Sequence, residues 1–123
     1  MIGNHILVVD DEVLINLALS EFLQGAGFAV ESVYSGATAV AAIRRHPPCA
    51  LVTDLDLGSG PDGFEVARYG RDTCPGLPVV FVSGSMRGRR PHEGVAGSTY
   101  LAKPCDGRRV LLALRQAGFL EIA

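Results

Sequence analysis

The chain has 123 residues, of which 48% are hydrophobic, and its formal net charge is −2 at pH 7. A chain of this length suits one domain and buries roughly two thirds of its unfolded surface, enough for a core without disulfide or metal staples. The composition excludes a disordered chain, and the slightly acidic balance gives no electrostatic basis for binding nucleic acid or a membrane surface.

The three cysteines, Cys49, Cys74 and Cys105, are widely spaced and contain no Cys-x-x-Cys pair. Their odd number and spacing indicate reduced thiols rather than a disulfide framework or a zinc site. The first residues lack the basic segment of a signal peptide, and no apolar run approaches the ~20 residues that span a bilayer. We therefore expect a cytoplasmic protein without membrane contact.

Strand and helix patterns alternate along the chain. Short apolar runs predict buried strands, and apolar residues at helical spacing predict the helices between them. The runs predict strands at 6–9, 28–33, 50–53, 78–82 and 99–102. The helical patterns cover 12–26, 36–45, about 64–71, and a last helix that Asp106 caps and that continues to about 117.

Residues that stop or cap helices support these boundaries. Gly25 and Gly27 end the first helix, Ser35 is placed to cap the second, and Pro47-Pro48 stops the second helix. The alternation predicts a parallel sheet with helices on both faces and right-handed crossovers. We expect residues 1–123 to form a single domain, with no internal repeat or linker.

The segment 84–98 departs from this alternation. A helix is due between the last two strands, yet the segment contains four glycines, one proline and three arginines. Glycine and proline disfavour a helix interior by ~1 and ~3 kcal/mol. We therefore expect a degraded or shortened helix, at most a short turn near 91–95. Three arginines in an acidic chain indicate a solvated loop or protein-contact patch rather than direct nucleic-acid binding.

Polar residues directly follow four of the apolar runs. They are Asp10 with Asp11, then Asp54, Ser83 and Lys103. In an open parallel sheet, ligands bind beyond the carboxyl ends of the strands, so these side chains are expected in one pocket. Crowded carboxylates favour a divalent cation. An ammonium and a hydroxyl beside that cation would form a receptor for a phosphoryl group.

Taken together, these residues resemble the response-regulator receiver domain of two-component signalling. The resemblance covers essentially the whole chain, in the family's order, and rests on five stretches, 7–12, 51–54, 61–63, 78–84 and 100–104. It implies a flavodoxin-like (CheY-like) α/β fold, a doubly wound five-stranded parallel sheet in the order 2-1-3-4-5.

The resemblance also assigns roles around the phosphorylation site. It implies that Asp54 is the phosphorylated aspartate, that Ser83 hydrogen-bonds the phosphoryl group, and that Lys103 contacts a phosphoryl oxygen. The Lys103–Pro104 peptide bond is expected to be cis, and Tyr100 is expected to be the aromatic switch residue. Phosphoryl transfer needs mainly positioning and charge neutralisation, which agrees with these assignments.

Magnesium is the cofactor that the resemblance implies. Asp11 would bind Mg²⁺ directly, Asp10 directly or through water, and Asp54 and the backbone carbonyl of Asp56 would complete the protein ligands. Mg²⁺ prefers a few oxygen ligands together with waters. The loop after Asp54 is one residue longer than the commonest family spacing, and Cys105 replaces a usual bulky apolar residue.

The implied function is phosphoryl acceptance within a phosphorelay. The donor would be a sensor histidine kinase or a histidine phosphotransfer protein, and the output a phosphorylation-controlled contact with a downstream protein. Such a domain is no classical enzyme, since it catalyses only its own phosphorylation and dephosphorylation. We expect a monomer or weak dimer, because many receivers dimerise through the face that segment 84–98 alters.

Two alternatives stay open at this point. One is a receiver-like interaction module that works without phosphate. The other is a phosphatase of the haloacid-dehalogenase type, whose strand-end Asp-x-Asp is mimicked by Asp54 and Asp56, with Ser83 and Lys103 following. In those enzymes the Asp-x-Asp motif comes first and the acidic pair last, whereas here Asp10-Asp11 comes first.

Overall fold

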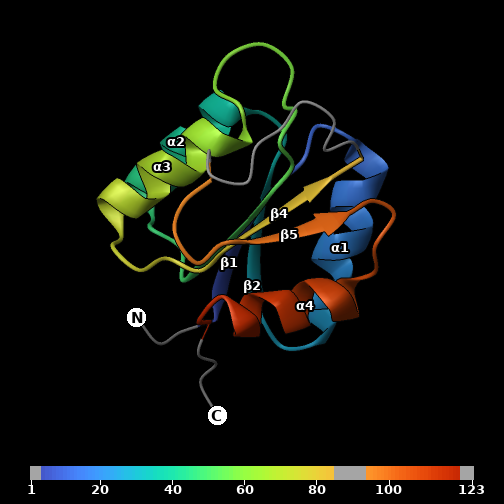
Figure 1. The fold of residues 1–123 in the computed structure, drawn as a ribbon. Coiled ribbons are helices and arrows are strands. Elements are labelled where there is room, and N and C mark those ends of the chain that lie inside the picture. Colours follow the sequence, from blue (N-terminus) through green and yellow to red (C-terminus); the bar gives the residue numbers. More distant parts are fainter. Residues whose placement is uncertain (1–3, 85–93, 120–123) are drawn as a thin grey trace.

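The computed structural model describes residues 4–84 and 94–119. Within these residues, helices cover both faces of one parallel sheet (Figure 1). The strands are β1 (His5–Val9), β2 (Ala29–Val33), β3 (Ala50–Thr53), β4 (Val79–Ser83) and β5 (Thr99–Ala102). The helices are α1 (Val13–Gly25), α2 (Gly36–Arg45), α3 (Gly63–Thr73) and α4 (Gly107–Gln116).

The strand order is β2-β1-β3-β4-β5, and every neighbouring pair is parallel. This confirms the predicted doubly wound sheet. Helices α2 and α3 pack together on one face, and α1 and α4 on the other (Figure 1). Val9 pairs with Thr53 and Ser83 with Ala102, so the carboxyl ends of the central strands meet at one edge.

The core consists of two apolar layers, one on each face of the sheet. Leu7, Leu51 and Phe81 point toward α2 and α3, and Val8 and Val52 belong to the layer beneath α1 and α4. Because the central strands are covered on both faces, nearly every residue along them is buried and apolar. This explains why the strands could be recognised as short apolar runs.

The predicted helix caps are present. The Ser35 hydroxyl accepts from the Thr38 amide at 3.1 Å, and an Asp106 carboxylate oxygen accepts from the Arg109 amide at 2.9 Å. The sequence analysis missed a third cap, at α3. There the Asp62 side chain accepts from the Glu65 amide, and the Glu65 carboxylate accepts from the Asp62 amide. This capping box starts α3 at Gly63, one residue before the predicted start.

The expected shortened helix between β4 and β5 falls mostly on residues 85–93, outside the described residues. The described flanks, Gly84 and residues 94–98, contain bends and turns and no helix. Among the helices of the described residues, none is both long and apolar enough to cross a membrane.

A buried amide anchors the first turns of α1. Asn16 is 0% exposed, and its Nδ2 donates to the backbone carbonyls of Asp10 at 3.1 Å and Val33 at 2.9 Å. Ser20 donates to Asn16 Oδ1 at 3.0 Å and also contacts the Ser32 hydroxyl at 2.6 Å. The site end of α1 is therefore fixed to β1 and β2 by hydrogen bonds, and the backbone of Asp10 is held with it.

Gly63 packs directly against the backbone that follows β3. A Cβ built on Gly63 would lie 2.1 Å from the Asp54 carbonyl oxygen, a distance that real Cβ atoms essentially never show. The Gly63 amide also donates to the Leu55 carbonyl at 2.9 Å. Only glycine allows the start of α3 to approach Asp54 this closely.

We expect Gly63→Ala to lower the free energy of unfolding by ~2–3 kcal/mol, because the added methyl must displace backbone rather than a flexible side chain. Urea unfolding followed by circular dichroism measures this loss. Gly25→Ala is the matched control, since a Cβ there meets nothing within 4 Å. The control should be neutral or slightly stabilising. Equal stability of the two variants would contradict the close approach at Gly63.

Candidate functional site

The site lies where four strands end. Asp10 follows β1 and Asp54 follows β3, and the Asp54 amide donates to the Val9 carbonyl at 2.9 Å. On the other side, the Lys103 amide donates to the Ser83 carbonyl at 2.9 Å, which ties the end of β5 to the end of β4. The backbone ladder of the sheet thus sets where each of these side chains begins.

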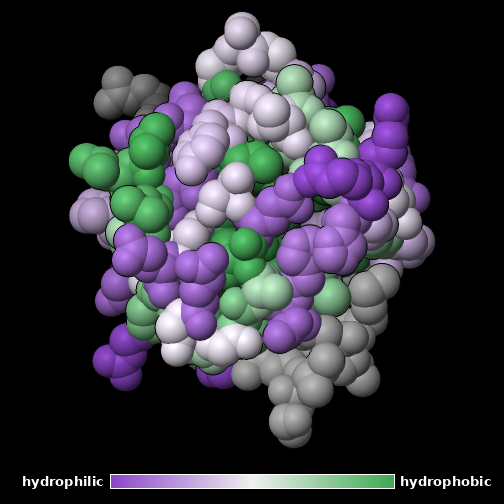
Figure 2. Space-filling view, turned by 180° about the vertical axis from the view of Figure 1, so that it is seen from behind, coloured by the Kyte–Doolittle hydropathy of each residue, from purple (hydrophilic) through white to green (hydrophobic). Residues whose placement is uncertain are grey.

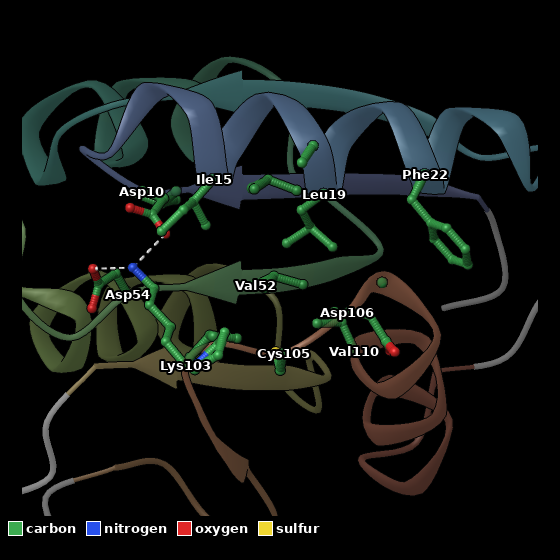
Figure 3. Close-up of a pocket in the computed structure, with 16 residues that line it drawn as sticks. Asp10, Ile15, Leu19, Phe22, Val52, Asp54, Lys103, Cys105, Asp106 and Val110 are labelled. Carbon is green, nitrogen blue, oxygen red and sulfur yellow. Dashed lines mark hydrogen bonds and ion pairs between the residues drawn. The ribbon is translucent and has the colours of Figure 1, made fainter.

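The Lys103 ammonium occupies the centre of the site. Its Nζ lies 2.8 Å from Asp10 Oδ2, 2.6 Å from Glu12 Oε2 and 2.9 Å from Asp54 Oδ2. Figure 3 shows Lys103 reaching across the end of the sheet to Asp10 and Asp54. An ammonium has three donors, so each carboxylate receives one of them. The Lys103, Asp10 and Asp54 side chains are 9%, 8% and 7% exposed, whereas Glu12 is 58% exposed.

Backbone amides hold the second oxygen of each buried carboxylate. The Glu12 amide donates to Asp10 Oδ1 at 2.9 Å, and the Asp56 amide donates to Asp54 Oδ1 at 3.3 Å. Asp10 and Asp54 are therefore fixed at both oxygens, one by backbone and one by Lys103. This arrangement limits the rotation of the two carboxylates before any ligand arrives.

The electrostatics of the site follow from burial and pairing. Burial raises the pKa of Asp10, and the hydrogen bonds from Lys103 and from the Glu12 amide only partly offset that rise. Burial by itself lowers the pKa of Lys103, but its hydrogen bonds to Asp10, Glu12 and Asp54 outweigh this effect and raise it above the ordinary value. The ammonium therefore remains charged across the physiological pH range.

The remaining predicted residues lie around this centre without all joining it. Ser83 is buried at the end of β4. Asp11 and Asp56 are exposed. The carboxylates whose oxygens lie within 4.8 Å of one another are Asp10, Glu12 and Asp54, and Asp11 is not one of them among the described residues. The direct role of Asp11 at a metal therefore stays a prediction.

Glu12 is a site residue that the sequence analysis did not single out. It stands at the N-cap position of α1, directly after the acidic pair, and its side chain turns back to Lys103. A third consecutive carboxylate at a strand end was the available signal. Its significance depends on the direction of the side chain, which the sequence pattern does not give.

Tyr100 belongs to an aromatic stack beside the site. Its ring lies 5.0 Å from the Phe81 ring, at an interplanar angle of 26°. A Cβ on Gly94 would lie 2.0 Å from the Tyr100 hydroxyl oxygen, so the absence of a side chain there makes room for the tyrosine. The switch role of Tyr100 stays a prediction. The Lys103–Pro104 peptide bond is cis, as expected.

The donor set of the site suits magnesium. Three carboxylates converge on one point, and carboxylate oxygens are the hard ligands that Mg²⁺ prefers. The Lys103 ammonium now neutralises the same oxygens. A divalent cation in this cluster would therefore take over part of the role that Lys103 has in the structure.

An apolar cavity of about 340 Å³ adjoins the site, between α1, the sheet and the start of α4. Ile15, Leu19 and Phe22 line it from α1, with Val52 below and Cys105 beside α4 (Figure 3). Burial raises the pKa of the Cys105 thiol, which keeps it protonated. The site is thus open toward an apolar hollow rather than enclosed by polar groups.

The outer face of α1 continues this apolar surface. Hydrophobic side chains gather at the left edge of Figure 2, the side on which α1 lies when Figure 1 is viewed from behind. The exposed fractions are 58% for Val13, 79% for Leu14 and 49% for Leu17. Exposed apolar side chains in such a group are typical of a protein interaction surface.

The sheet order and the carboxylate–lysine cluster at its carboxyl edge define the flavodoxin-like class of doubly wound α/β proteins that bind phosphoryl ligands or metal at that edge. Within this class, the family described as response regulator receiver domain matches residues 6–115, and the chain belongs to that family. Receiver domains interact with histidine kinases and are generally not classical enzymes. The family match decides against the dehalogenase-type phosphatase.

Curated relatives agree with the assignment to the receiver family. The chain is 34% identical over 113 residues to the acid tolerance regulatory protein ActR of Sinorhizobium medicae, covering 90% of this chain and 58% of that protein. It is 33% identical over 114 residues to the probable transcriptional regulatory protein TcrX of Mycobacterium tuberculosis, covering 89% of this chain and 47% of that protein. The chain spans about half the length of the curated relatives it matches.

Solved structures give the same result. A response regulator receiver protein from Sinorhizobium medicae superposes with a TM-score of 0.87 at 34% identity, covering 94% of each chain. The receiver domain of the sensor histidine kinase PA1611 from Pseudomonas aeruginosa has a TM-score of 0.80 at 25% identity, covering 94% of this chain and 98% of that one. That structure has a magnesium ion coordinated in its active-site cleft.

Lys103→Met would leave Asp10 and Asp54 buried without a counter-charge. At about pH 8 we expect the variant to lose ~3–5 kcal/mol of unfolding free energy, the range for breaking a buried ion pair. The loss should shrink toward acid pH. The pKa of Asp10 is already above 3.8 in the folded protein, and without the ammonium it rises further. A carboxyl group whose pKa is higher in the folded than in the unfolded protein stabilises the fold at pH values below its unfolded pKa. That stabilisation is lost as the pH rises through the folded pKa.

Urea unfolding of wild type and Lys103→Met at several pH values between about 4 and 8 tests this expectation. Lys103→Arg keeps the positive charge and is the matched control. A loss of stability in Lys103→Met that does not change with pH would contradict an ionic origin and would indicate lost packing instead.

Proposed function

We propose that this chain accepts a phosphoryl group on Asp54 from the phosphohistidine of a sensor kinase or phosphotransfer protein. The observation that carries the proposal is the buried Asp54 carboxylate, held at the open edge of the sheet and paired with the Lys103 ammonium at 2.9 Å. Receiver-family membership supports the same reaction. The chain's enzymatic activity would be limited to its own phosphorylation and dephosphorylation.

In the proposed reaction, an Asp54 oxygen attacks the phosphorus of the donor's phosphohistidine. A phosphorus–oxygen bond forms, the phosphorus–nitrogen bond breaks, and the electron pair leaves with the donor's imidazole. Lys103 would pair with a phosphoryl oxygen, and Ser83 would donate a hydrogen bond to another. These contacts stabilise the negative charge that gathers on the equatorial oxygens.

Magnesium is the proposed cofactor. Asp10, Asp11, Asp54 and the Asp56 carbonyl would hold it, and Glu12 is a further carboxylate in the cluster. When bound, Mg²⁺ neutralises charge on the phosphoryl oxygens. The magnesium in the related PA1611 receiver supports this choice. The backbone amides of Glu12 and Asp56 orient Asp10 and Asp54 toward the ligand before it arrives.

Signalling would follow from the added phosphoryl charge. That charge would draw the Ser83 hydroxyl inward, and Tyr100 would move into the vacated space. Tyr100 now stacks on Phe81 and touches the open position at Gly94, so a change of its rotamer would alter the surface around β5. A downstream protein would read this local change in a two-state element.

The proposal for the whole chain is a single receiver domain over residues 1–123 in the cytoplasm, as monomer or weak dimer, without direct nucleic-acid contact. The donor would contact the exposed apolar face of α1, beside which the site opens. Leu14 is 79% exposed there and adjoins the cavity-lining Ile15. Apolar side chains at this place would bind an apolar helix face of the donor.

Intact mass after incubation with acetyl phosphate is the first test of the proposed function. We expect the mass of one phosphoryl group on the wild type, dependent on Mg²⁺ and absent from Asp54→Asn, because the amide is a far weaker nucleophile than the carboxylate. Glu21→Gln, an exposed change elsewhere on α1, is the matched control. An unmodified wild-type protein that also fails to bind beryllofluoride would instead favour the phosphate-independent interaction module.

The α1 face is tested by Leu14→Asp. We expect transfer from the phosphorylated donor to slow by about tenfold or more, since a charge at the centre of an apolar contact costs at least ~1.4 kcal/mol. Labelling by acetyl phosphate should be unchanged, because the small donor does not need α1. Ala41→Asp, an exposed change on α2, is the control for added charge. Equal slowing by both variants would reject α1 as the contact.

A further inference from the structure

Lys103 is the only lysine among the 123 residues. Lysine and arginine together number 11 in the chain, and all the others are arginines. Every function that needs a lysine ammonium therefore depends on this one side chain. The proposed reaction needs it twice, first to neutralise the empty site and then to meet the phosphoryl group.

Lys103 and a bound magnesium ion would compete for the same carboxylate oxygen atoms. In the structure, Lys103 Nζ pairs with Asp10 Oδ2 and Asp54 Oδ2 at 2.8 and 2.9 Å. Their Oδ1 atoms are held by backbone amides, whereas Oδ2 pairs with the Lys103 side chain, so Oδ2 is the oxygen whose partner can be exchanged for a cation. A magnesium ion at these oxygens would withdraw two of the three partners of Lys103 and repel its ammonium. Lys103 would still have to remain beside Asp54.

Glu12 is the third partner and differs from the other two. Its Oε2 lies 2.6 Å from Lys103 Nζ, the shortest of the three contacts. Its side chain is 58% exposed, so it can follow the ammonium outward without losing a buried position. It is also outside the ligand set predicted for the metal. Charge-assisted hydrogen bonds are shorter and stronger than neutral ones, so this contact favours an ammonium position at the mouth of the site.

We propose that Glu12 is a positioning residue, which holds the Lys103 ammonium beside Asp54 when a magnesium ion takes the oxygens of Asp10 and Asp54. This inference rests on the proposed function. Glu12 acts through Lys103 and does not itself bind the metal. Its membership of the carboxylate cluster makes metal ligation the competing role that the experiment must separate.

The single lysine gives a direct readout. Protein grown with ¹³C-labelled lysine yields one set of lysine side-chain signals, all from Lys103. With saturating Mg²⁺, we expect the wild type to keep two distinct ε-methylene proton shifts, because the side chain stays fixed. In Glu12→Gln the two shifts should merge as the side chain becomes mobile, and Glu21→Gln should match the wild type. Unchanged lysine signals in Glu12→Gln with Mg²⁺ bound would overturn the proposal.

Mg²⁺ affinity, measured by calorimetry in a Lys103→Met background, separates the two roles of Glu12. If Glu12 acts through Lys103, adding Glu12→Gln to this background should change the Mg²⁺ dissociation constant by about threefold or less. This is the effect expected from removing one exposed charge near the ion. A larger loss, of the order of tenfold or more, would identify Glu12 as a metal ligand and overturn the proposal. If Lys103→Met is too unstable to titrate, the lysine signals decide alone.

The outcome is distinct from that of the proposed function. A wild type that binds Mg²⁺ and is phosphorylated on Asp54, but whose Lys103 signals ignore Glu12→Gln, refutes only the positioning role. A wild type that neither binds Mg²⁺ nor becomes phosphorylated refutes the proposed function, and the positioning role with it.

Discussion

The structure around the proposed site depends on one ammonium group. Lys103 neutralises three carboxylates that would otherwise face one another at the end of the sheet, and each contact is between 2.6 and 2.9 Å. Two of these carboxylates are buried, so their charges can be present only because a counter-charge is buried with them. The folded chain therefore contains a pocket of carboxylates in which the Lys103 ammonium occupies the place of a bound cation.

The sheet and α1 supply the precision that this pairing needs. Backbone hydrogen bonds between the ends of β1, β3, β4 and β5 fix the starting points of Asp54 and Lys103. Asn16 holds the Asp10 backbone from the side of α1, and Gly63 lets α3 pack against the Asp54 carbonyl. Each support comes from a different element. The position of the site therefore depends on packing in several elements of the domain, although its chemistry involves only a few side chains.

Much of the fold could be predicted from the sequence, because strands buried on both faces appear as uninterrupted apolar runs. The strand-end position of Asp10, Asp54 and Lys103 followed from the same pattern, and the structure places these three together. Glu12 could not be predicted in this way, since it stands at the N-cap of α1, beyond the strand end, and only the direction of its side chain brings it to Lys103. The roles of Asp11, Ser83 and Tyr100 remain predictions that depend on a bound ligand.

The apolar pattern of α1 predicted a helix but did not identify its buried face. Val13, Leu14 and Leu17 contribute to that pattern and are exposed, whereas the buried residues of the helix are Asn16, Ser20 and Leu23. Hydrophobicity alone would have predicted that the face with Val13, Leu14 and Leu17 packs against the sheet. Tertiary hydrogen bonds from Asn16 to two strand ends decide the orientation, and the single-sequence pattern contains no information about them.

This polar anchor has a mechanical consequence for α1. Apolar contacts are non-directional, so they fix the rotation of a helix about its axis less specifically than hydrogen bonds do. The two hydrogen bonds from Asn16 end on different strands and are directional, so rolling would break both. The two hydrogen bonds therefore fix the rotation of the first turns of α1 about the helix axis. At the far end of the helix, Leu23 is held by apolar packing. A partner that pulls on the outer face of α1 would transmit torque to the backbone of Asp10 rather than let the helix slip.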